Sequence, residues 1–351
     1  MGIFQKLFNR DIGIDLGTTK TLVYVKDKGI VVHEPTVVAI NNKTNQIIAI
    51  GKDAYEMIGK TPPHITASRP LTNGVISDFE VAEKFLRYLL NKIKRKGILN
   101  SVFDWPKLII SIPTGGTEVE KRAVEDAAKN AGAKEVFLIE EPMAVALGAR
   151  LPILESKGIL VADIGGGTTE VAVISLGGVV VSKSIRVAGN KLNEDIIYYF
   201  RDKFKMAIGE KTAENIKILL GSAIDLGTNQ DMKVKGRDLT HGLPKEIKIK
   251  AQEIREAITP SLIKIIDAIK ATIETTPPEL ISDIMTEGVL LSGGTSLLKG
   301  LDKLVEDSVG LKVKVIEDPI TAVIRGIGTV MEDFESFKSC LVTISREKPP
   351  I

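Results

Sequence analysis

Two stretches of the chain repeat one order of apolar and polar positions. Near the start, an apolar run containing Asp15 leads into a turn with Gly17 and Thr18, and a second apolar run follows at 22–25. The same order returns around Asp163, where glycines form the turn and another apolar run follows. Such a pattern predicts a β-hairpin with a polar tip. Because a repeat of this size indicates duplicated units, we expect two related domains whose hairpin tips share one cleft.

Strands and helices alternate along the rest of the chain, as they do in α/β domains. Apolar residues that recur every three or four positions predict helices at 77–95, 117–131, 212–220 and 252–275. Short buried strands are predicted at 108–112, 136–139 and 289–291, and a helix through Leu304 is expected after the last of them. The sequence thus predicts two α/β cores.

Capping residues mark where some of these helices begin and end. Ser77 with Glu80, and Thr117 with Glu120, have the spacing of a capping box. Gly132 is a typical stop signal for the second helix. We therefore expect these two helices to begin at the hydroxyl side chains of Ser77 and Thr117.

Two segments interrupt the cores, at 33–76 and 225–250, and both are rich in Pro, Gly, Asn and short β-like runs. Segments of this kind are predicted to be smaller subdomains inserted in the cores. We expect two domains: domain I at 1–147 plus 325–351, with its inserted subdomain at about 33–76, and domain II at 148–324, with its inserted subdomain at about 188–250.

Composition and charge exclude several classes of protein. Of the 351 residues, 44% are apolar and 26% are charged, and the formal net charge is +2. This is ordinary globular composition, and so small a charge gives no general case for nucleic-acid binding. The single cysteine, Cys340, excludes an intramolecular disulfide and fits a reducing cytosol. No uncharged apolar run reaches the roughly 18 residues of a membrane-spanning helix. We also expect no signal peptide, because Lys6 interrupts the short apolar stretch of Met1–Arg10.

The two hairpin tips suit a phosphate chain. A glycine-bearing turn directs backbone N–H groups toward an anion and lets the backbone approach it closely. Hydroxyl donors are added by Thr18, Thr19, Thr168 and Thr169. Asp15 and Asp163 would then lie near the phosphates, where carboxylates require a cation such as Mg²⁺. One Asp-x-Gly hairpin alone is an ordinary turn, but two copies with the same flanking strands favour the phosphate site.

Two further motifs are compatible with a nucleotide site. Glu140 and Glu141 lie between a predicted strand and a helix that Pro142 begins. If the γ-phosphate lies between the hairpins, such a carboxylate could orient an attacking water. The local sequence by itself favours a plainer interpretation, in which the acidic pair stabilises a helix N-terminus. Gly293-Gly294-Thr295 follows a strand and opens the expected helix, which predicts either a generic phosphate or ribose site or a tight turn.

Other catalytic signatures are missing from the sequence. There is no Walker-type phosphate loop and no Gly-x-Ser-x-Gly elbow. The three histidines, His33, His64 and His241, are scattered, and no Cys/His cluster offers a zinc site.

On these motifs, the chain resembles the actin/heat-shock-chaperone/sugar-kinase ATPase superfamily and, within it, the MreB family of bacterial actins. The segments that carry the resemblance span nearly the whole chain in family order. They are 13–18, 21–25, 28–32, 34–35, 69–71, 74–78, 138–143, 163–173, 207–214, 276–280 and 291–295. The resemblance implies an actin-like two-domain α/β fold with duplicated cores, a nucleotide cleft between the domains and a small subdomain inserted in each core.

The resemblance also implies roles for particular residues. Asp15 and Asp163 would hold Mg²⁺ through water, and Glu141 would position the hydrolytic water with Glu140 in support. The residues implied to bind ATP or ADP are Gly17, Thr18, Thr19, Lys20, Gly165, Gly166, Gly167, Thr168, Glu214, Asn215, Lys217, Gly293, Gly294 and Thr295. Lys20 departs from the family pattern, and it could reach the phosphates or point into solvent. Such departures also suggest a divergent paralogue.

Two segments could contact a membrane. The first is a short amphipathic turn at 3–8 with Lys6 and Arg10, and the second is the basic run Lys92–Lys96 with the apolar residues after it. The candidate membrane contacts are Phe4, Phe8, Ile98, Leu99, Phe103 and Trp105. Alternatively, the cations favour a helix C-terminus and the apolar residues pack on the core; the resemblance favours the membrane.

The resemblance therefore implies an ATPase, with hydrolysis coupled to filament assembly and turnover that could be slow. The expected partners are other copies of the chain in paired antiparallel protofilaments, the anionic inner membrane surface and a membrane-protein adaptor, with no nucleic acid. The expected location is the cytoplasm at the inner face of the cell membrane, and the expected role is setting cell shape. The alternatives are a paralogue acting in motility or helicity, a chaperone ATPase, and a sugar kinase, which would need a base for its acceptor hydroxyl.

Overall fold

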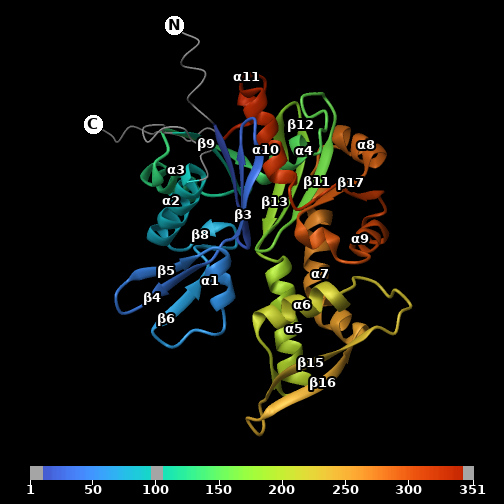
Figure 1. The fold of residues 1–351 in the computed structure, drawn as a ribbon. Helices are drawn as coiled ribbons and strands as arrows, with labels where there is room; N and C mark the ends of the chain where they lie inside the picture. The colour runs from blue at the N-terminus through green and yellow to red at the C-terminus, as the bar shows by residue number, and fades with distance from the viewer. Residues whose placement is uncertain (1–10, 96–105, 343–351) are drawn as a thin grey trace. The chain divides into compact units, whose positions relative to one another are not determined.

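The computed structural model describes residues 11–95 and 106–342 (Figure 1). Contacts divide the chain into two compact units. The first consists of Met1–Ser156, Ile174–Val179 and Thr321–Ile351, and the second of Lys157–Val173 and Val180–Ile320. The domain boundaries expected from the sequence stay a prediction, and each unit is described by itself.

The core of the first unit is a five-stranded sheet. Its strand order is β10-β9-β1-β2-β3, with bounds Glu135–Glu140, Lys107–Ile112, Ile12–Leu16, Lys20–Val25 and Gly29–Pro35. Strands β1, β2 and β3 are antiparallel neighbours, whereas β9 lies parallel to β1 and β10 parallel to β9. The carboxyl ends of β1, β9 and β10 therefore meet at one edge of the sheet.

A second five-stranded sheet repeats this order. It runs β18-β17-β11-β12-β13, with bounds Val313–Val315, Val289–Ser292, Ile159–Ile164, Thr169–Ser175 and Gly178–Ile185. Strand β17 is parallel to β11, as β9 is to β1, and β18 is parallel to β17. Each motif of the sequence repeat thus forms the first two strands of a sheet, and the predicted pair of hairpins is confirmed.

Helices and small sheets complete each unit. In the first unit they are α1 Lys52–Met57, α2 Phe79–Arg95, α3 Glu118–Ala131, α4 Glu141–Gly148, α10 Ala322–Glu332 and α11 Phe334–Phe337, with η3 Lys338–Cys340 and the strands β4 Val38–Asn41, β5 Gln46–Ile50, β6 Ile65–Ser68, β7 Leu71–Thr72 and β8 Val75–Ile76. In the second they are α5 Gly189–Lys203, α6 Glu210–Leu220, α7 Ala251–Glu274, α8 Pro278–Glu287, α9 Leu301–Val309, η2 Gly294–Leu297, β14 Met206–Ala207, β15 Asp231–Asp238 and β16 Pro244–Lys250. No helix in the described ranges is both long and apolar enough to cross a membrane.

Some helix boundaries differ from the prediction. The capping box of Thr117 and Glu120 is confirmed, and Gly132 ends α3 in the left-handed conformation. The predicted cap at Ser77 is wrong: its hydroxyl donates to the carbonyl of Pro70, and the carboxylate of Asp78 accepts the backbone N–H of Val81 instead. A carboxylate one residue later reaches the same helix end, so α2 starts one position further on.

The region after β17 also differs from the prediction. Instead of one helix from the Gly-Gly turn through Leu304, the chain forms the short 3₁₀ turn η2 and then a separate helix, α9. Gly300 lies between them in the left-handed conformation, with φ of 72°, which an α-helix cannot contain. Helix α6 likewise begins at Glu210 rather than at Thr212.

Lys92 is held inside the first unit rather than left free at the end of α2. Its ammonium pairs with the buried carboxylate of Glu34 on β3, and it lies 5.5 Å from the ring centroid of Tyr88. Burial lowers the pKa of Lys92, but hydrogen bonds with Glu34 and Tyr88 outweigh that effect, so the pKa is raised. Glu34 also accepts the backbone N–H of Lys52 at the start of α1, at 2.9 Å. The ammonium of Lys92 is therefore engaged within the first unit, and the membrane contact expected for the basic run stays a prediction.

Helices α4 and α10 of the first unit pack backbone against backbone. A Cβ atom on Gly148 would overlap the carbonyl of Ala322, and one on Gly326 would overlap the carbonyl of Ala144. Helix α10 also lies directly on β1, where a Cβ atom on Gly13 would overlap Ile327. Glycine at these positions allows α10 to hold both the start of the sheet and the helix that follows β10.

In the second unit, β15 and β16 form an antiparallel ribbon with one exposed, lysine-rich face. Lys233 lies directly opposite Lys248 in the register, a pairing of like charges that weakens a ribbon. Glu246 partly offsets it, because its carboxylate lies 3.4 Å from the Lys233 ammonium. The exposed charged residues of this face are Asp231, Lys233, Lys235, Arg237, Glu246, Lys248 and Lys250.

We predict that Gly326→Ala strongly destabilises the protein. The new methyl group would meet a backbone carbonyl that can move only if α4 and α10 separate, and overpacking of this kind typically costs about 1–3 kcal/mol or more. Thermal unfolding followed by calorimetry measures the effect. Gly209→Ala is the matched control, because nothing lies within 4 Å of a Cβ at that position and its φ is −87°. Equal unfolding temperatures for the two variants would contradict the packing argument.

Candidate functional site

The first unit places Asp15 beside a serine at the carboxyl edge of its sheet. Asp15 is near the end of β1, and the register of β1 with β9 continues to Ser111. The hydroxyl of Ser111 donates to Oδ1 of Asp15 at 3.1 Å. Ser111 is almost fully buried, whereas Asp15 is half-buried, so this hydrogen bond is partly shielded from water.

The turn after β1 is built around Gly17. A Cβ atom there would lie 2.6 Å from the carbonyl oxygen of Lys20, so this tight hairpin excludes any larger residue. The carbonyl of Gly17 accepts from the hydroxyl of Thr36 at 2.7 Å. The hydroxyl of the buried Thr18 accepts the backbone N–H of Gly74 at 2.8 Å. Because Thr18 accepts in that bond, its own proton remains available for a second partner.

Lys20 and Thr19 occupy the other side of this turn. Lys20 begins β2 with its side chain exposed, and the carbonyl of Thr19 accepts the backbone N–H of Thr36 at 3.0 Å. Burial, and then the positive charge of Lys20, lower the pKa of His33 on the neighbouring strand. The side chain of Lys20 is exposed, and its expected contact with the phosphates stays a prediction.

Glu140 and Glu141 occupy the end of β10 and the start of α4. Glu140 lies opposite Ile112 of β9. Burial raises the pKa of Glu140, while the positive charge of Lys121 and the backbone N–H of Gly115 act in the opposite direction. Glu141 is also buried and is the first residue of α4. The two carboxyl groups therefore have different surroundings, and Glu140 is the one engaged with α3 and the loop before it.

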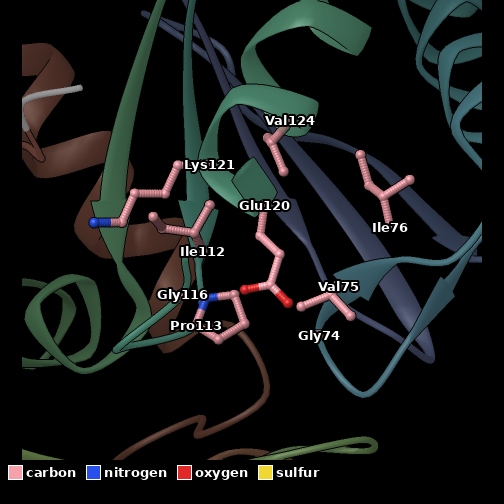
Figure 2. Close-up of a pocket in the computed structure, with 9 residues that line it drawn as sticks. All are labelled: Gly74, Val75, Ile76, Ile112, Pro113, Gly116, Glu120, Lys121 and Val124. Atoms are coloured by element: carbon pink, nitrogen blue, oxygen red, sulfur yellow. The ribbon is translucent and has the colours of Figure 1, made fainter. Parts of the chain in front are cut away.

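A small pocket lies beside this region, between the β7–β8 turn and the first turns of α3 (Figure 2). Its lining includes Gly74, which bonds to Thr18, together with Ile112 and Val124. The interior measures about 20 Å³, which is room for a water molecule and not for a nucleotide. We therefore regard this pocket as a packing defect beneath the turn and not as a ligand site.

The second unit seals Asp163 inside its sheet. Asp163 lies on β11 directly opposite Ser292 of β17, and only 6% of its surface is exposed. Burial raises the pKa of Asp163 to about 6, although a hydrogen bond from Ser292 opposes the shift. Within the described ranges, Oδ1 of Asp163 has no hydrogen-bond partner. A buried carboxylate oxygen without a donor is costly unless a ligand satisfies it.

The glycine turn after β11 is held from two sides. The carbonyl of Gly165 accepts from the hydroxyl of Thr295 at 2.7 Å and from the backbone N–H of Gly189 at 3.2 Å. The carbonyl of Gly166 accepts the backbone N–H of Asn190 at 2.8 Å. The start of α5 and the turn η2 thereby fix the conformation of the glycine turn. Gly167 and Thr168 follow directly, both buried.

The turn at Gly293 lies against the same carboxylate. Gly293 has a φ of +80°, and a Cβ atom there would overlap the carbonyl of Ile164 and lie 2.9 Å from Oδ1 of Asp163. Glycine is therefore required at this position by both its conformation and its neighbours. Gly294 faces open space, since nothing lies within 4 Å of a Cβ built on it.

Lys217 reaches the same cluster from α6. Its ammonium donates to the carbonyl of Gly189 at 2.8 Å. Burial lowers the pKa of Lys217 to about 8, and the negative charges of Glu214 and then Glu210 oppose this shift. An anion near Lys217 would favour its charged form. Asn215 lies on the same helix with its side chain exposed.

The structure thus connects, within the second unit, five of the residues that the sequence predicted there. Asp163, Gly165, Lys217, Gly293 and Thr295 form one connected cluster. In the first unit, Asp15, Gly17 and Thr18 lie at a single hairpin tip. The candidate membrane contacts Phe4, Phe8, Ile98, Leu99, Phe103 and Trp105 lie outside the described residues.

Sequence reasoning missed four residues of these two clusters: Ser111, Ser292, Gly74 and Gly189. Ser292 stood inside the Ser-Gly-Gly-Thr motif, but only its position opposite Asp163 gives it a partner. Ser111 is an ordinary strand residue until the register of β1 with β9 is known. Parallel pairing of the strands that end in these motifs is the signal that could have identified both.

The donor set fits a magnesium ion held mainly through water. Among the described residues there is no group of three or more His, Cys, Asp or Glu side chains able to hold a metal directly. Each hairpin instead offers one carboxylate, Asp15 or Asp163. Mg²⁺ usually keeps several waters and uses one or two carboxylates together with phosphate oxygens. The unpartnered oxygen of Asp163 is consistent with such a ligand.

Comparison with known proteins identifies the family. A family model described as "MreB/Mbl protein" matches residues 9–339. The chain belongs to the MreB/Mbl family. Cell shape-determining protein MreB of Escherichia coli is 46% identical over 333 residues, which cover 94% of this chain and 95% of that protein. Cell shape-determining protein Mbl of Bacillus cereus is 44% identical over 329 residues, covering 94% and 98%.

Solved structures of the MreB/Mbl family match the fold. The crystal structure of MreB5 of Spiroplasma citri bound to ADP is 40% identical, with a TM-score of 0.87, and covers 93% of this chain and 98% of that one. The structure of the same protein bound to AMPPNP has a TM-score of 0.88. The family resemblance and the actin-like two-domain α/β fold expected from the sequence are therefore confirmed, and this chain is a homologue of bacterial actin.

We predict that Asp163→Asn stabilises the protein free of metal and nucleotide at neutral pH. The pKa of this carboxyl is raised from 3.8 to about 6, so the folded state prefers the protonated form. Ionising Asp163 therefore lowers the free energy of unfolding. This loss is absent below pH 4, grows between pH 4 and 6, and reaches its full value of about 3 kcal/mol above pH 6. The variant should unfold at a higher temperature than wild type at pH 7 but not at pH 4.

The measurement is thermal unfolding in EDTA across this pH range, with Asp202→Asn at an exposed position as the control. A stability difference between Asp163→Asn and wild type that does not change with pH would contradict the burial of an ionised carboxylate.

Proposed function

We propose that this chain binds ATP with Mg²⁺, hydrolyses it, and polymerises into filaments at the inner face of the cell membrane. The observation that carries the proposal is the sealed carboxylate of Asp163, whose Oδ1 has no hydrogen-bond partner among the described residues and lies beside Gly293. A buried, unsatisfied carboxylate next to a glycine turn is suited to an ion–phosphate ligand. The structures of MreB5 with ADP and with AMPPNP, at 40% identity, support the nucleotide.

Asp15 and Asp163 would hold the magnesium ion through its waters, and the ion would neutralise charge on the phosphate oxygens. The hydroxyl of Ser111 donates to Asp15, and Ser292 lies directly opposite Asp163 in the register of β11 with β17. We propose that the turns at Gly17, Thr18, Thr19 and Lys20 and at Gly165, Gly166, Gly167 and Thr168 bind the phosphates. Thr18 is suited to this, because the proton of its hydroxyl is not used in the bond from Gly74.

We assign the adenosine end to the cluster on α6. Lys217 is anchored to the carbonyl of Gly189, and Glu214 lies one turn before it on the same helix. Carboxylate and ammonium groups at this spacing can bond to the hydroxyls of a ribose. Asn215, Gly293, Gly294 and Thr295 would complete the contacts, with the two glycines allowing the ligand to approach the backbone.

Glu141 is the better candidate for orienting the attacking water. Glu140 already faces the charge of Lys121 and the N–H of Gly115, and its raised pKa favours the protonated form. Glu141 begins α4, which α10 holds through the close contact at Gly148 and Gly326. A carboxylate on a rigid helix can keep a water in line with a phosphate, which is the main requirement of phosphoryl transfer to water.

Assembly and membrane contact complete the proposal. A head-to-tail contact that does not close into a ring makes a filament, and we propose paired antiparallel protofilaments of this chain. We also propose the anionic inner membrane and a membrane-protein adaptor as partners in setting cell shape, as the names of the relatives suggest. Weak membrane contacts of single subunits would add up along a filament.

We predict nucleotide-dependent sedimentation. High-speed pelleting across a protein titration, with and without ATP and Mg²⁺, should show polymer above a critical concentration only when both are present. Phosphate release should then rise steeply with protein concentration and should not respond to added sugars. Protein that binds ATP but stays in the supernatant at every concentration would contradict the filament and favour a kinase or chaperone-like ATPase.

We predict that Glu141→Gln slows single-turnover phosphate release by about 100-fold or more while ATP binding remains, since positioned general bases typically contribute 10²–10⁴-fold. The matched variant is Glu140→Gln, which changes the neighbouring carboxyl and should have the smaller effect. Rapid-quench kinetics give the rate and calorimetry gives the affinity. Equal rates for wild type and Glu141→Gln would remove Glu141 from this role.

A further inference from the structure

Each of the two five-stranded sheets places a serine beside the aspartate of its hairpin, in the equivalent position. In the first sheet, Ser111 lies one strand away from Asp15, in the row set by the β1–β9 register. In the second sheet, Ser292 lies one strand away from Asp163, in the row set by the β11–β17 register. Strands β1 and β11 correspond in the duplicated order, and so do β9 and β17. The two Asp–Ser pairs are therefore equivalent positions of the two cores.

Both serines are sealed from water. Ser111 is 3% exposed and Ser292 is 0% exposed. A hydroxyl that donates to a carboxylate in such surroundings makes a charge-assisted bond that water cannot replace. The hydroxyl also carries no charge, so it orients the carboxylate without competing with a cation for it. An arginine or lysine in the same place would orient the carboxylate equally well but would repel Mg²⁺.

We propose that Ser111 and Ser292 are positioning residues, each of which fixes the carboxylate of the aspartate on the adjacent parallel strand so that it accepts a water of the bound Mg²⁺. This inference rests on the proposed function and deepens it, because it assigns the rigidity of the ion site to two residues that do not touch the ion. Partners of metal-ligating groups typically change metal affinity by 10–100-fold when they are removed.

Asp163 depends on its serine partner more strongly than Asp15 does. Asp163 is 6% exposed, with Oδ1 unpartnered among the described residues, so Ser292 is its principal hydrogen-bond donor. The hydroxyl of Ser292 also lies 3.4 Å from the carbonyl of Pro319. That distance is longer than a normal O–H···O hydrogen bond, so the carboxylate of Asp163 is the stronger acceptor for the single proton of Ser292. Asp15 lies closer to the surface and has further interactions. Loss of Ser292 should therefore weaken the ion site more than loss of Ser111.

The experiment compares Ser292→Ala, Ser111→Ala and Ser292→Thr in the full chain. Calorimetric titration with ATP at a series of free Mg²⁺ concentrations gives the magnesium dependence, and titration in EDTA gives the affinity for the nucleotide alone. Ser261→Ala is the matched control, because Ser261 is a buried serine that also donates to an aspartate, Asp195, between α7 and α5. Thermal unfolding shows whether each variant is folded.

We expect Ser292→Ala to raise the Mg²⁺ concentration needed for half-maximal enhancement of ATP binding by about tenfold. Ser111→Ala should raise it less, and Ser292→Thr should restore it because the hydroxyl returns. Affinity in EDTA should stay unchanged in all variants, and Ser261→Ala should lower only the unfolding temperature. Suppose that a variant loses ATP affinity in EDTA by the same factor as it loses ATP affinity in the presence of Mg²⁺. The serine would then have a merely structural role, and the inference would be overturned.

Two other outcomes distinguish a failure of the positioning role from a failure of the proposed function. If wild type shows Mg²⁺-dependent ATP binding and both alanine variants match it, the positioning role is wrong and the proposed function stands. If wild type binds no ATP at any Mg²⁺ concentration, the proposed function itself is wrong, and the positioning role is wrong with it.

Discussion

The backbone contact between α4 and α10 is the constraint on which the first unit depends. Gly148 and Gly326 let the two helices meet without intervening side chains, and Gly13 lets α10 lie directly on β1. One helix thus fixes both the strand that carries Asp15 and the helix that carries Glu141. Because backbone groups in such contacts cannot change rotamer, the backbone positions of Asp15 and Glu141 relative to each other are set by the fold.

Duplication explains why the two candidate clusters, one in each unit, are similar in arrangement but chemically unequal. Both sheets have the same strand order, and both end their first strand at an aspartate beside a serine. The second half encloses its carboxylate more completely and surrounds it with Gly293, Thr295 and Lys217. A carboxylate held in this way weakens the empty protein, and such local instability is a common property of sites built for a ligand.

Local pattern was sufficient to predict much of the fold. The hairpins at Asp15 and Asp163 and the caps of α3 follow from residues close together in sequence, so the sequence alone identified them. The remaining features depended on contacts between residues that are far apart in the sequence. The part-buried ion pair of Lys92 could be recognised only once Glu34, 58 residues away, was placed beside it. Likewise, Ser111 and Ser292 acquire a role only through the register of parallel strands, which no local pattern specifies.

The lysine-rich face of the β15–β16 ribbon should influence the rates at which this chain associates with other molecules. Lys248 pairs with Asp231 and Lys233 with Glu246, but the basic residues Lys235, Arg237 and Lys250 on the same face are in excess of these two carboxylates, so the face keeps a positive field. At physiological ionic strength that field reaches roughly 8 Å, far enough to guide an acidic surface during the last step of an encounter. Association rates at this face would therefore fall as salt is added, while dissociation rates, which depend on close contacts, would change much less.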